Sequence, residues 1–208
     1  FKAFKRGAAD ILIGTQMVAK GLDFPRVTLV GVITADTALN LPDFRAAERT
    51  FQLLTQVAGR TGRSSLGGKV IIQTYTPDHY SIVSAGTHDY ETFFGEEISL
   101  REDFGYPPFS HLLRVVFSGI QEKDLARAAG EFKDALNHYL KESGGEILGP
   151  GPCPLPKIKG RYRWHLVLKS KNIGIISKAV KTVWDHIQGK SGSRDIRIIL
   201  DINPINML

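Results

Sequence analysis

The stretch FRAAERTFQLLTQVAGRTGR, residues 44–63, has the spacing of an amphipathic helix that ends in two glycine–arginine steps. The apolar residues recur every three or four positions and share one face: Ala47, Phe51, Leu54 and Ala58. The polar residues on the opposite face are Arg49, Gln52, Gln56, Arg60 and Arg63. We expect one face of this helix to pack and the other to recognise a ligand.

Short apolar runs on either side of this helix predict strands. ADILIGT (9–15) and VTLVGVITAD (27–36) precede it, and GGKVIIQTY (67–75) follows it. Strands that alternate with helices indicate an α/β fold with a parallel sheet and crossover connections. Ligands of such sheets bind beyond the carboxyl ends of the strands.

The rest of the chain has a different pattern. Its predicted elements are a strand at 111–118, a helix at 121–141, strands near 145–149 and at 161–169, a helix at 174–188 and a strand at 195–202. This βαββαβ order predicts an α+β ferredoxin-like domain with both helices on one face of the sheet. Gly105, Pro107 and Pro108 interrupt any helix at the join, so we expect two domains, 1–104 and 105–208.

Strand alternation assigns side chains in this second domain to two faces. Those predicted to face the helices are Tyr162, Trp164, Leu166 and Leu168, with Ile196, Ile198, Leu200 and Ile202 on the last strand. The arginines predicted to share the open face are Arg114, Arg161, Arg163 and Arg197, with Lys157 and Lys159 in the loop beside it. This surface would follow DNA phosphates without sequence preference; the alternative is an ordinary solvated basic face.

Composition agrees with a soluble globular protein that has an anionic partner. The net charge of +6 is uneven, because residues 1–104 hold 11 basic and 12 acidic residues and residues 105–208 hold 16 and 9. No apolar run approaches the roughly 18 residues that cross a bilayer, so no membrane role is expected. Cys153 is the single cysteine, which excludes an internal disulfide and a cysteine-rich metal site and favours a reducing cytoplasm.

The two glycine–arginine steps are suited to phosphate. A glycine before Arg60 and before Arg63 lets the backbone approach a bulky anion, and planar guanidinium groups grip phosphate oxygens in pairs. The alternative is that both cations only complement the dipole at the end of the helix.

The first half resembles the second motor lobe, a RecA-like domain, of superfamily 2 helicases. QVAGRTGR (56–63) matches the last motif of that lobe, and GTQMVAKGLDFP (14–25) matches the motif before it. The continuation ADTALNLPDFRAAERT, then GKVIIQTYTPDHYSI, HDYETFF, YPPFSHLLRVVFSG and GRYRWHLVLKS, is similar to the C-terminal part of the PriA family of bacterial replication-restart helicases. The resemblance covers nearly the whole chain.

The resemblance implies roles for residues of the first half. Arg60 and Arg63 would contact the γ-phosphate of ATP, one of them as an arginine finger, and Gln56 would link the nucleotide to DNA-binding elements. Gly21 and Asp23 would lie near the ribose and phosphates; the alternative for Asp23 is a turn before Phe24 and Pro25.

The same resemblance places Thr15 and Gln16 at the DNA backbone, although Thr15 could equally be an ordinary residue at a strand end. The family's cysteine-rich zinc module would precede Phe1, so we expect a lobe that is incomplete at its start and a chain that binds no zinc.

The resemblance further implies a 3′–5′ ATP-dependent DNA helicase of the bacterial cytoplasm, with ATP and Mg²⁺ as cofactors. Its partners would be branched or single-stranded DNA, single-stranded-DNA-binding protein and primosome proteins. GGKV (67–70) is no P-loop, because Arg63 and Val70 stand where glycine and a hydroxyl are needed. We therefore expect no cofactor and no ATP hydrolysis for this chain alone. The alternatives are a nucleic-acid-binding module without an ATP-linked role and a protein-interaction platform.

Overall fold

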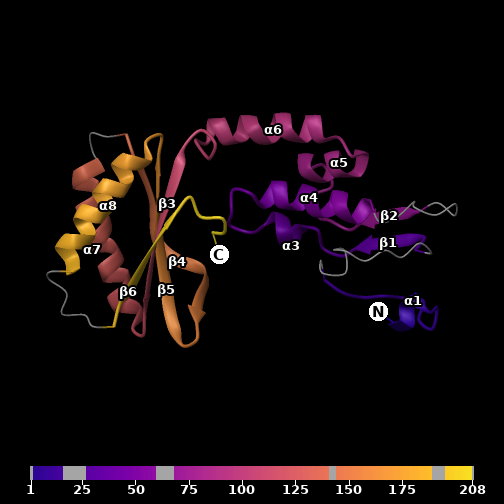
Figure 1. Ribbon diagram of the computed structural model, residues 1–208, viewed down its shortest axis with the longest axis horizontal. Helices are drawn as coiled ribbons and strands as arrows, with labels where there is room; N and C mark the ends of the chain where they lie inside the picture. Colours follow the sequence, from indigo (N-terminus) through magenta and orange to yellow (C-terminus); the bar gives the residue numbers. More distant parts are fainter. Residues whose placement is uncertain (1, 16–26, 60–67, 141–143, 189–194, 208) are drawn as a thin grey trace. The chain divides into compact units, whose positions relative to one another are not determined.

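The protein forms two compact units, Phe1–Ile98 and Ser99–Leu208. The computed structural model describes residues 2–15, 27–59, 68–140, 144–188 and 195–207, which are coloured in Figure 1. Helix α6, Tyr90–Asp103, runs across the division between the units. No helix within the described ranges is both long and apolar enough to span a bilayer.

The first unit contains a small parallel sheet. β1 (Leu29–Val32) pairs with β2 (Lys69–Ile72), with Leu29 opposite Lys69 and Val32 opposite Ile72. The described helices of this unit, besides α6, are α1 (Lys2–Lys5), α3 (Asp36–Leu39), α4 (Ala46–Ala58) and α5 (Tyr80–Thr87). The parallel pairing of the strands expected within 27–36 and 67–75 is confirmed, although both strands are shorter than predicted.

The strand predicted at residues 9–15 is wrong, because this segment forms neither a strand nor a helix. Ile11 and Ile13 are 78% and 87% exposed. An apolar run becomes a strand only when a neighbouring strand satisfies its backbone groups, and none of the described strands pairs with these residues.

Helix α4 builds the core of the first unit. The predicted helix is confirmed over Ala46–Ala58, and Phe51 and Leu54 are buried as expected. Val57 is buried too, whereas Ala47 and Ala58 are only half-buried, so the packed face is rotated slightly from the predicted one. The Phe51 ring stacks on Phe93 of α6 at a centroid distance of 4.2 Å.

The second unit is an antiparallel sheet covered by two helices. Its elements are β3 (His111–Gly119), α7 (Glu122–Leu140), β4 (Glu146–Ile158), β5 (Arg161–Ser170), α8 (Ile173–Gln188) and β6 (Arg197–Ile202). They follow one another in the order that the sequence predicts. The strands lie side by side in the order β4-β5-β3-β6, and α7 and α8 lie on the same face of the sheet (Figure 1).

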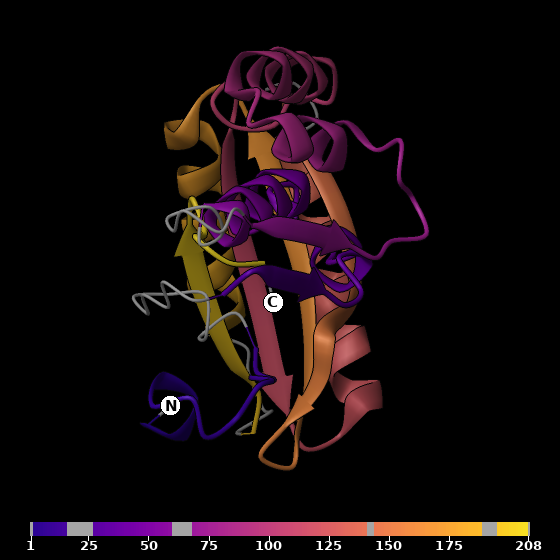
Figure 2. The same cartoon turned by 90° about the vertical axis from the view of Figure 1, so that its right-hand side faces the viewer.

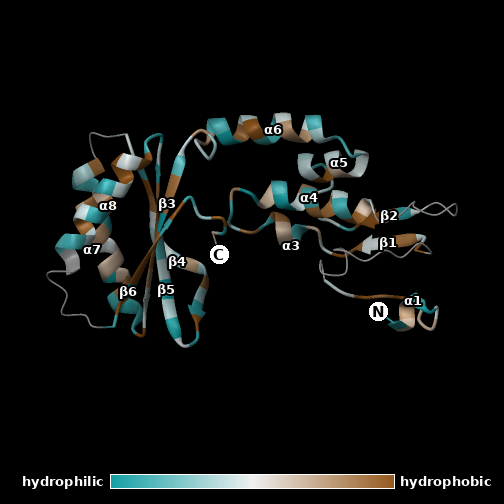
Figure 3. Cartoon of the chain, viewed as in Figure 1, coloured by the Kyte–Doolittle hydropathy of each residue, from teal (hydrophilic) through white to brown (hydrophobic). Residues whose placement is uncertain are grey.

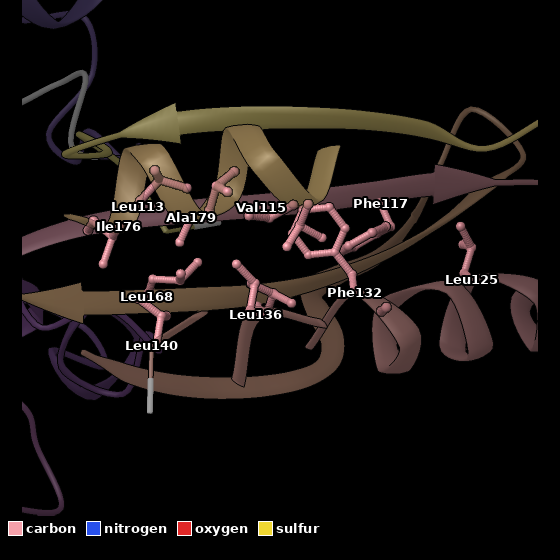
Figure 4. Close-up of a cluster of buried hydrophobic side chains, with 14 residues drawn as sticks. Leu113, Val115, Phe117, Leu125, Phe132, Leu136, Leu140, Leu168, Ile176 and Ala179 are labelled. Carbon is pink, nitrogen blue, oxygen red and sulfur yellow. The ribbon is translucent and has the colours of Figure 1, made fainter. Parts of the chain in front are cut away.

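The core of the second unit lies between this face and the helices (Figure 4). Phe117 of β3 meets Phe132 of α7 edge to face, with ring centroids 5.5 Å apart. Tyr162, Trp164, Leu166 and Leu168 pack in this core, as the alternation of β5 predicts.

Strand β4 is longer than the predicted strand near 145–149. It continues to Ile158 through two register shifts, between Leu148 and Gly151 and between Pro152 and Lys157. Proline is tolerated there because β4 is an edge strand, whose outer backbone groups need no partner.

Strand β6 is only partly covered. Figure 3 shows that it is apolar along most of its length. Ile196, just before it, and Ile198 pack against the core, but Leu200 and Ile202 are 41% and 54% exposed, so their predicted burial is wrong. β6 is the other edge strand, and α7 and α8 pack on the three strands beside it.

Candidate functional site

Most of the predicted nucleotide contacts lie outside the described residues. These are Gly21, Asp23, Arg60 and Arg63, together with the predicted DNA contact Gln16. Two of the site residues predicted in the first unit are described, Thr15 and Gln56. Thr15 is exposed at the end of an irregular segment, and Gln56 is half-buried two residues before the end of α4.

The polar face of α4 makes contacts within the unit. The Arg49 guanidinium lies 2.9 Å from the carboxylate of Asp43, whose side chain is fully buried. The Gln52 amide donates a hydrogen bond to Glu48 one turn earlier, at 3.1 Å. At the start of the predicted recognition face, Arg49 therefore ties the helix to the segment before it, and Gln52 bonds within the helix.

Asp36, for which the sequence suggests a loop or cap role rather than a metal site, lies at the carboxyl ends of the parallel strands and holds the segment after β2. Its buried carboxylate accepts hydrogen bonds from the hydroxyls of Thr74 and Thr76, at 2.9 and 3.1 Å, and from the Tyr75 backbone N–H at 3.2 Å. Burial acts to raise the pKa of Asp36, but these hydrogen bonds outweigh it and the net pKa is lowered. The available signal was an aspartate shortly after the apolar run of β1.

In the second unit, Arg114 lies on the face of β3 turned away from the helices, as predicted, but it is buried there and the expectation that it is exposed is wrong. It is 3% exposed. Its Nε donates to Nδ1 of His165 at 3.2 Å, Nη1 to the Asn206 carbonyl at 3.3 Å, and Nη2 to the Cys153 sulfur at 3.6 Å. β3 is an inner strand, and the irregular part of β4 and the segment after β6 both reach across the face to meet Arg114.

The groups around Arg114 are held in their neutral forms. Burial, with the nearby charges of Arg114 and Arg163, lowers the pKa of His165 to about 4. A neutral imidazole agrees with the geometry, because Nδ1 accepts the Arg114 hydrogen bond. Burial raises the pKa of the Cys153 thiol, and the charge of Arg114 only partly opposes this.

The other three predicted arginines gather at one end of this face. Arg163 and Arg197 both stand opposite Ser118, one on each neighbouring strand. Nη2 of Arg161 donates to the carbonyls of Ser118 and Asp195, the former at 3.1 Å, and its guanidinium pairs with the Asp195 carboxylate at 3.4 Å. We call Arg161, Arg163 and Arg197 the arginine cluster.

The neighbours of the arginine cluster leave its members unequally available. Arg163 reaches the Leu155 carbonyl at 3.5 Å and is half-buried, whereas Arg197 is exposed.

Within the part of the chain that the structure describes, no three histidine, cysteine or acidic side chains are grouped to hold a metal ion.

Two family models match the chain, one in each unit. Residues 102–205 match the primosomal protein N C-terminal domain, and residues 1–65 match the helicase conserved C-terminal domain. A de novo designed protein, Foldit4, aligns with 47% of the chain at 9% identity and a TM-score of 0.36, which is too weak to support an argument.

The curated relatives are replication restart proteins. PriA of Bacillus subtilis is 49% identical over 99% of this chain and 26% of its own length. PriA of Treponema pallidum is 38% identical over 99% of the chain and 31% of its own length, and PriA of Synechocystis is 46% identical over 80% and 20%. The chain thus spans between a fifth and a third of these relatives. It belongs to the PriA family of replication restart helicases, and its residues 102–205 are the C-terminal domain of that family.

Proposed function

We propose that this chain is part of an ATP-dependent 3′–5′ DNA helicase that acts in replication restart in the bacterial cytoplasm. It would supply the arginine-finger half of the ATPase site and a DNA-binding domain. The observation that carries the proposal is the match of a helicase C-terminal domain and a primosomal C-terminal domain within one chain. Single-stranded-DNA-binding protein and primosome proteins are the proposed protein partners.

In the ATPase half, Arg60 and Arg63 stabilise the charge that develops on the transferred phosphoryl group, and Gln56 links this site to DNA. Gly21 and Asp23 line the ribose and phosphates, and Thr15 and Gln16 contact the DNA backbone. The P-loop and the carboxylates that hold Mg²⁺ would come from parts of the longer protein outside this chain.

The test of the ATPase half uses a full-length PriA protein that carries this chain. Arg60→Ala or Arg63→Ala should lower the DNA-stimulated turnover on the order of 10³-fold, because an arginine finger acts mainly in the transition state. Arg127→Ala is the matched control, since Arg127 is a surface arginine of α7 whose side chain is 69% exposed. Unchanged turnover in both variants would contradict the arginine-finger role.

The DNA-binding half is the second unit, which we class as ferredoxin-like. Its element order and the strand order β4-β5-β3-β6 support that class. The arginine cluster would contact DNA phosphates, with Arg197 as its most accessible member. Arg114 would support this face from within by anchoring the segments around Cys153 and Asn206.

Charge reversal tests the DNA-binding half. Arg161→Glu with Arg163→Glu should weaken binding to branched and single-stranded DNA and reduce its dependence on salt, because phosphate contacts release counterions. Arg197→Glu is a milder variant, because the Arg197 side chain is exposed, and Arg127→Glu is the control. If the folded double variant and Arg197→Glu both bind DNA like the parent protein at low salt, the surface is only a solvated one.

A further inference from the structure

Exposed aliphatic side chains gather at the end of the β4–β5 hairpin. Leu155 and Ile158 of β4 are 52% and 41% exposed. Ile120, which follows the last residue of β3 at the same end of the sheet, is 52% exposed. The hairpin turn reaches beyond the ends of the neighbouring strands (Figure 2). We call Ile120, Leu155 and Ile158 the aliphatic tip.

Cations surround the aliphatic tip. Lys157 and Lys159 lie on the same hairpin, and the arginine cluster lies at the same end of the sheet. The Lys157 ammonium stands over the ring of Tyr162 at 4.3 Å. Asp195, which Arg161 engages, and Glu122, which accepts a hydrogen bond from Trp164 at 3.3 Å, also lie near this end, but the cations outnumber these two carboxylates. The field around the tip is therefore positive and suits a polyanion.

The hairpin holds Leu155 outward on a stiff support. Pro152, Pro154 and Pro156 fix the backbone on both sides of Leu155 and lack N–H groups. Arg163 holds the Leu155 carbonyl, and the neighbouring Cys153 is buried against Arg114. A partner strand could not pair with a backbone so poor in donors, which disfavours a protein docking along this edge.

We propose that the aliphatic tip contacts bases exposed where duplex DNA opens into single strands. The surrounding lysines and the arginine cluster would hold the flanking phosphates, and Leu155 and Ile158 would pack against the face of the last base pair. Aliphatic wedges act in this way between base steps in other DNA-binding proteins, and unstacking is least costly where pairing already ends. The proposal rests on the proposed DNA-binding function and assigns the contact with the junction to these aliphatic side chains.

The experiment compares the parent chain with a double variant that carries both Leu155→Ser and Ile158→Ser. Affinity is measured for a branched DNA, a relaxed covalently closed duplex, which has no end and so exposes no last base pair, and a single strand. The double variant should bind the branched DNA about tenfold more weakly, the scale of one lost base contact, and the other two forms within about twofold of the parent. Ile202→Ser is the control, because Ile202 is 54% exposed at the opposite end of the sheet.

The outcomes separate this proposal from the function beneath it. A parent chain that binds no DNA overturns the DNA-binding function itself. If the parent binds DNA but the double variant loses affinity equally for all three DNA forms, or for none of them, only the proposal about the aliphatic tip is overturned. If the double variant is misfolded by circular dichroism, the single variant Leu155→Ser, which is altered only at the exposed bulge, decides the same comparison.

A further arm replaces DNA by vesicles of anionic phosphatidylglycerol, because cations around aliphatic groups also suit a lipid surface. The proposal would be overturned in favour of a membrane contact by two results together. The parent would bind these vesicles and the double variant would not, while the double variant still bound branched DNA like the parent.

Discussion

At the scale of single residues, His165 makes the stability of the second unit sensitive to pH. Burial and the charges of Arg114 and Arg163 lower its folded pKa from 6.5 to about 4. Between these values the unfolded chain binds a proton that the folded chain does not, so protons favour unfolding. The stability that His165 contributes is therefore complete above pH 6.5 and is lost as the pH falls towards about 4.

We predict that His165→Gln flattens this dependence. Glutamine keeps an oxygen that can accept from Arg114 but does not titrate. Denaturant unfolding at several pH values from 7.5 to 4.5 measures the slope in parent and variant. His79 of the first unit also has a pKa lowered by burial, so the difference between the two proteins, rather than the parent's slope, isolates His165. Equal slopes would contradict the assignment.

At the scale of elements, Gly149 determines the course of the β4 backbone at the point where its regular pairing with β5 is first interrupted. Its φ of +92° is in the region that favours glycine, and an added Cβ would lie 3.0 Å from the His165 carbonyl oxygen. Gly149→Ala should therefore destabilise the second unit by at least ~2 kcal/mol, the strain of a left-handed alanine plus the clash.

Gly151 provides the matched control, because its φ is not positive and nothing lies within 4 Å of the position of its Cβ. Gly151→Ala should change the unfolding free energy by less than about 0.5 kcal/mol, as at an unconstrained site. Denaturant unfolding of both variants is the measurement, and similar losses in the two would show that the bend does not depend on Gly149.

At the scale of the whole molecule, each compact unit has a core of its own. Leu54 belongs to the core of the first and Phe132 to that of the second, and they are 1% and 0% exposed. We predict two separable unfolding transitions. Leu54→Ala should lower only one of them, by ~2–5 kcal/mol, and Phe132→Ala only the other, by ~3–5 kcal/mol.

Calorimetry, together with hydrogen exchange resolved to each unit, checks this prediction. Ile202→Ser, at an exposed edge position, should leave both transitions within about 0.5 kcal/mol of the parent. A single transition that both core variants shift equally would mean that the units unfold as one.

The parts of the candidate site that the sequence can address are those whose signals are local. The helicase roles of Arg60 and Arg63 come from the motif QVAGRTGR and stay predictions, since these residues lie outside the described ranges. The gathering of Arg163 and Arg197 on one face follows from alternation along two strands and needed only their register. The partners of Asp36 could not be predicted, because Thr74, Tyr75 and Thr76 lie almost forty residues away.

The sequence by itself determined the order of elements in the second unit and which side chains of β3 and β5 face the helices. Helical and strand periodicity are properties of neighbouring residues, so they can be read without knowing the fold. The tertiary structure alone decided that Arg114 is buried, that residues 9–15 form no strand and that Leu200 and Ile202 are exposed. Each of these outcomes depends on whether a segment distant in the sequence covers the residue, as Asn206 and Cys153 cover Arg114. Periodicity reports only on neighbouring residues, so it cannot show which distant segment packs on a face.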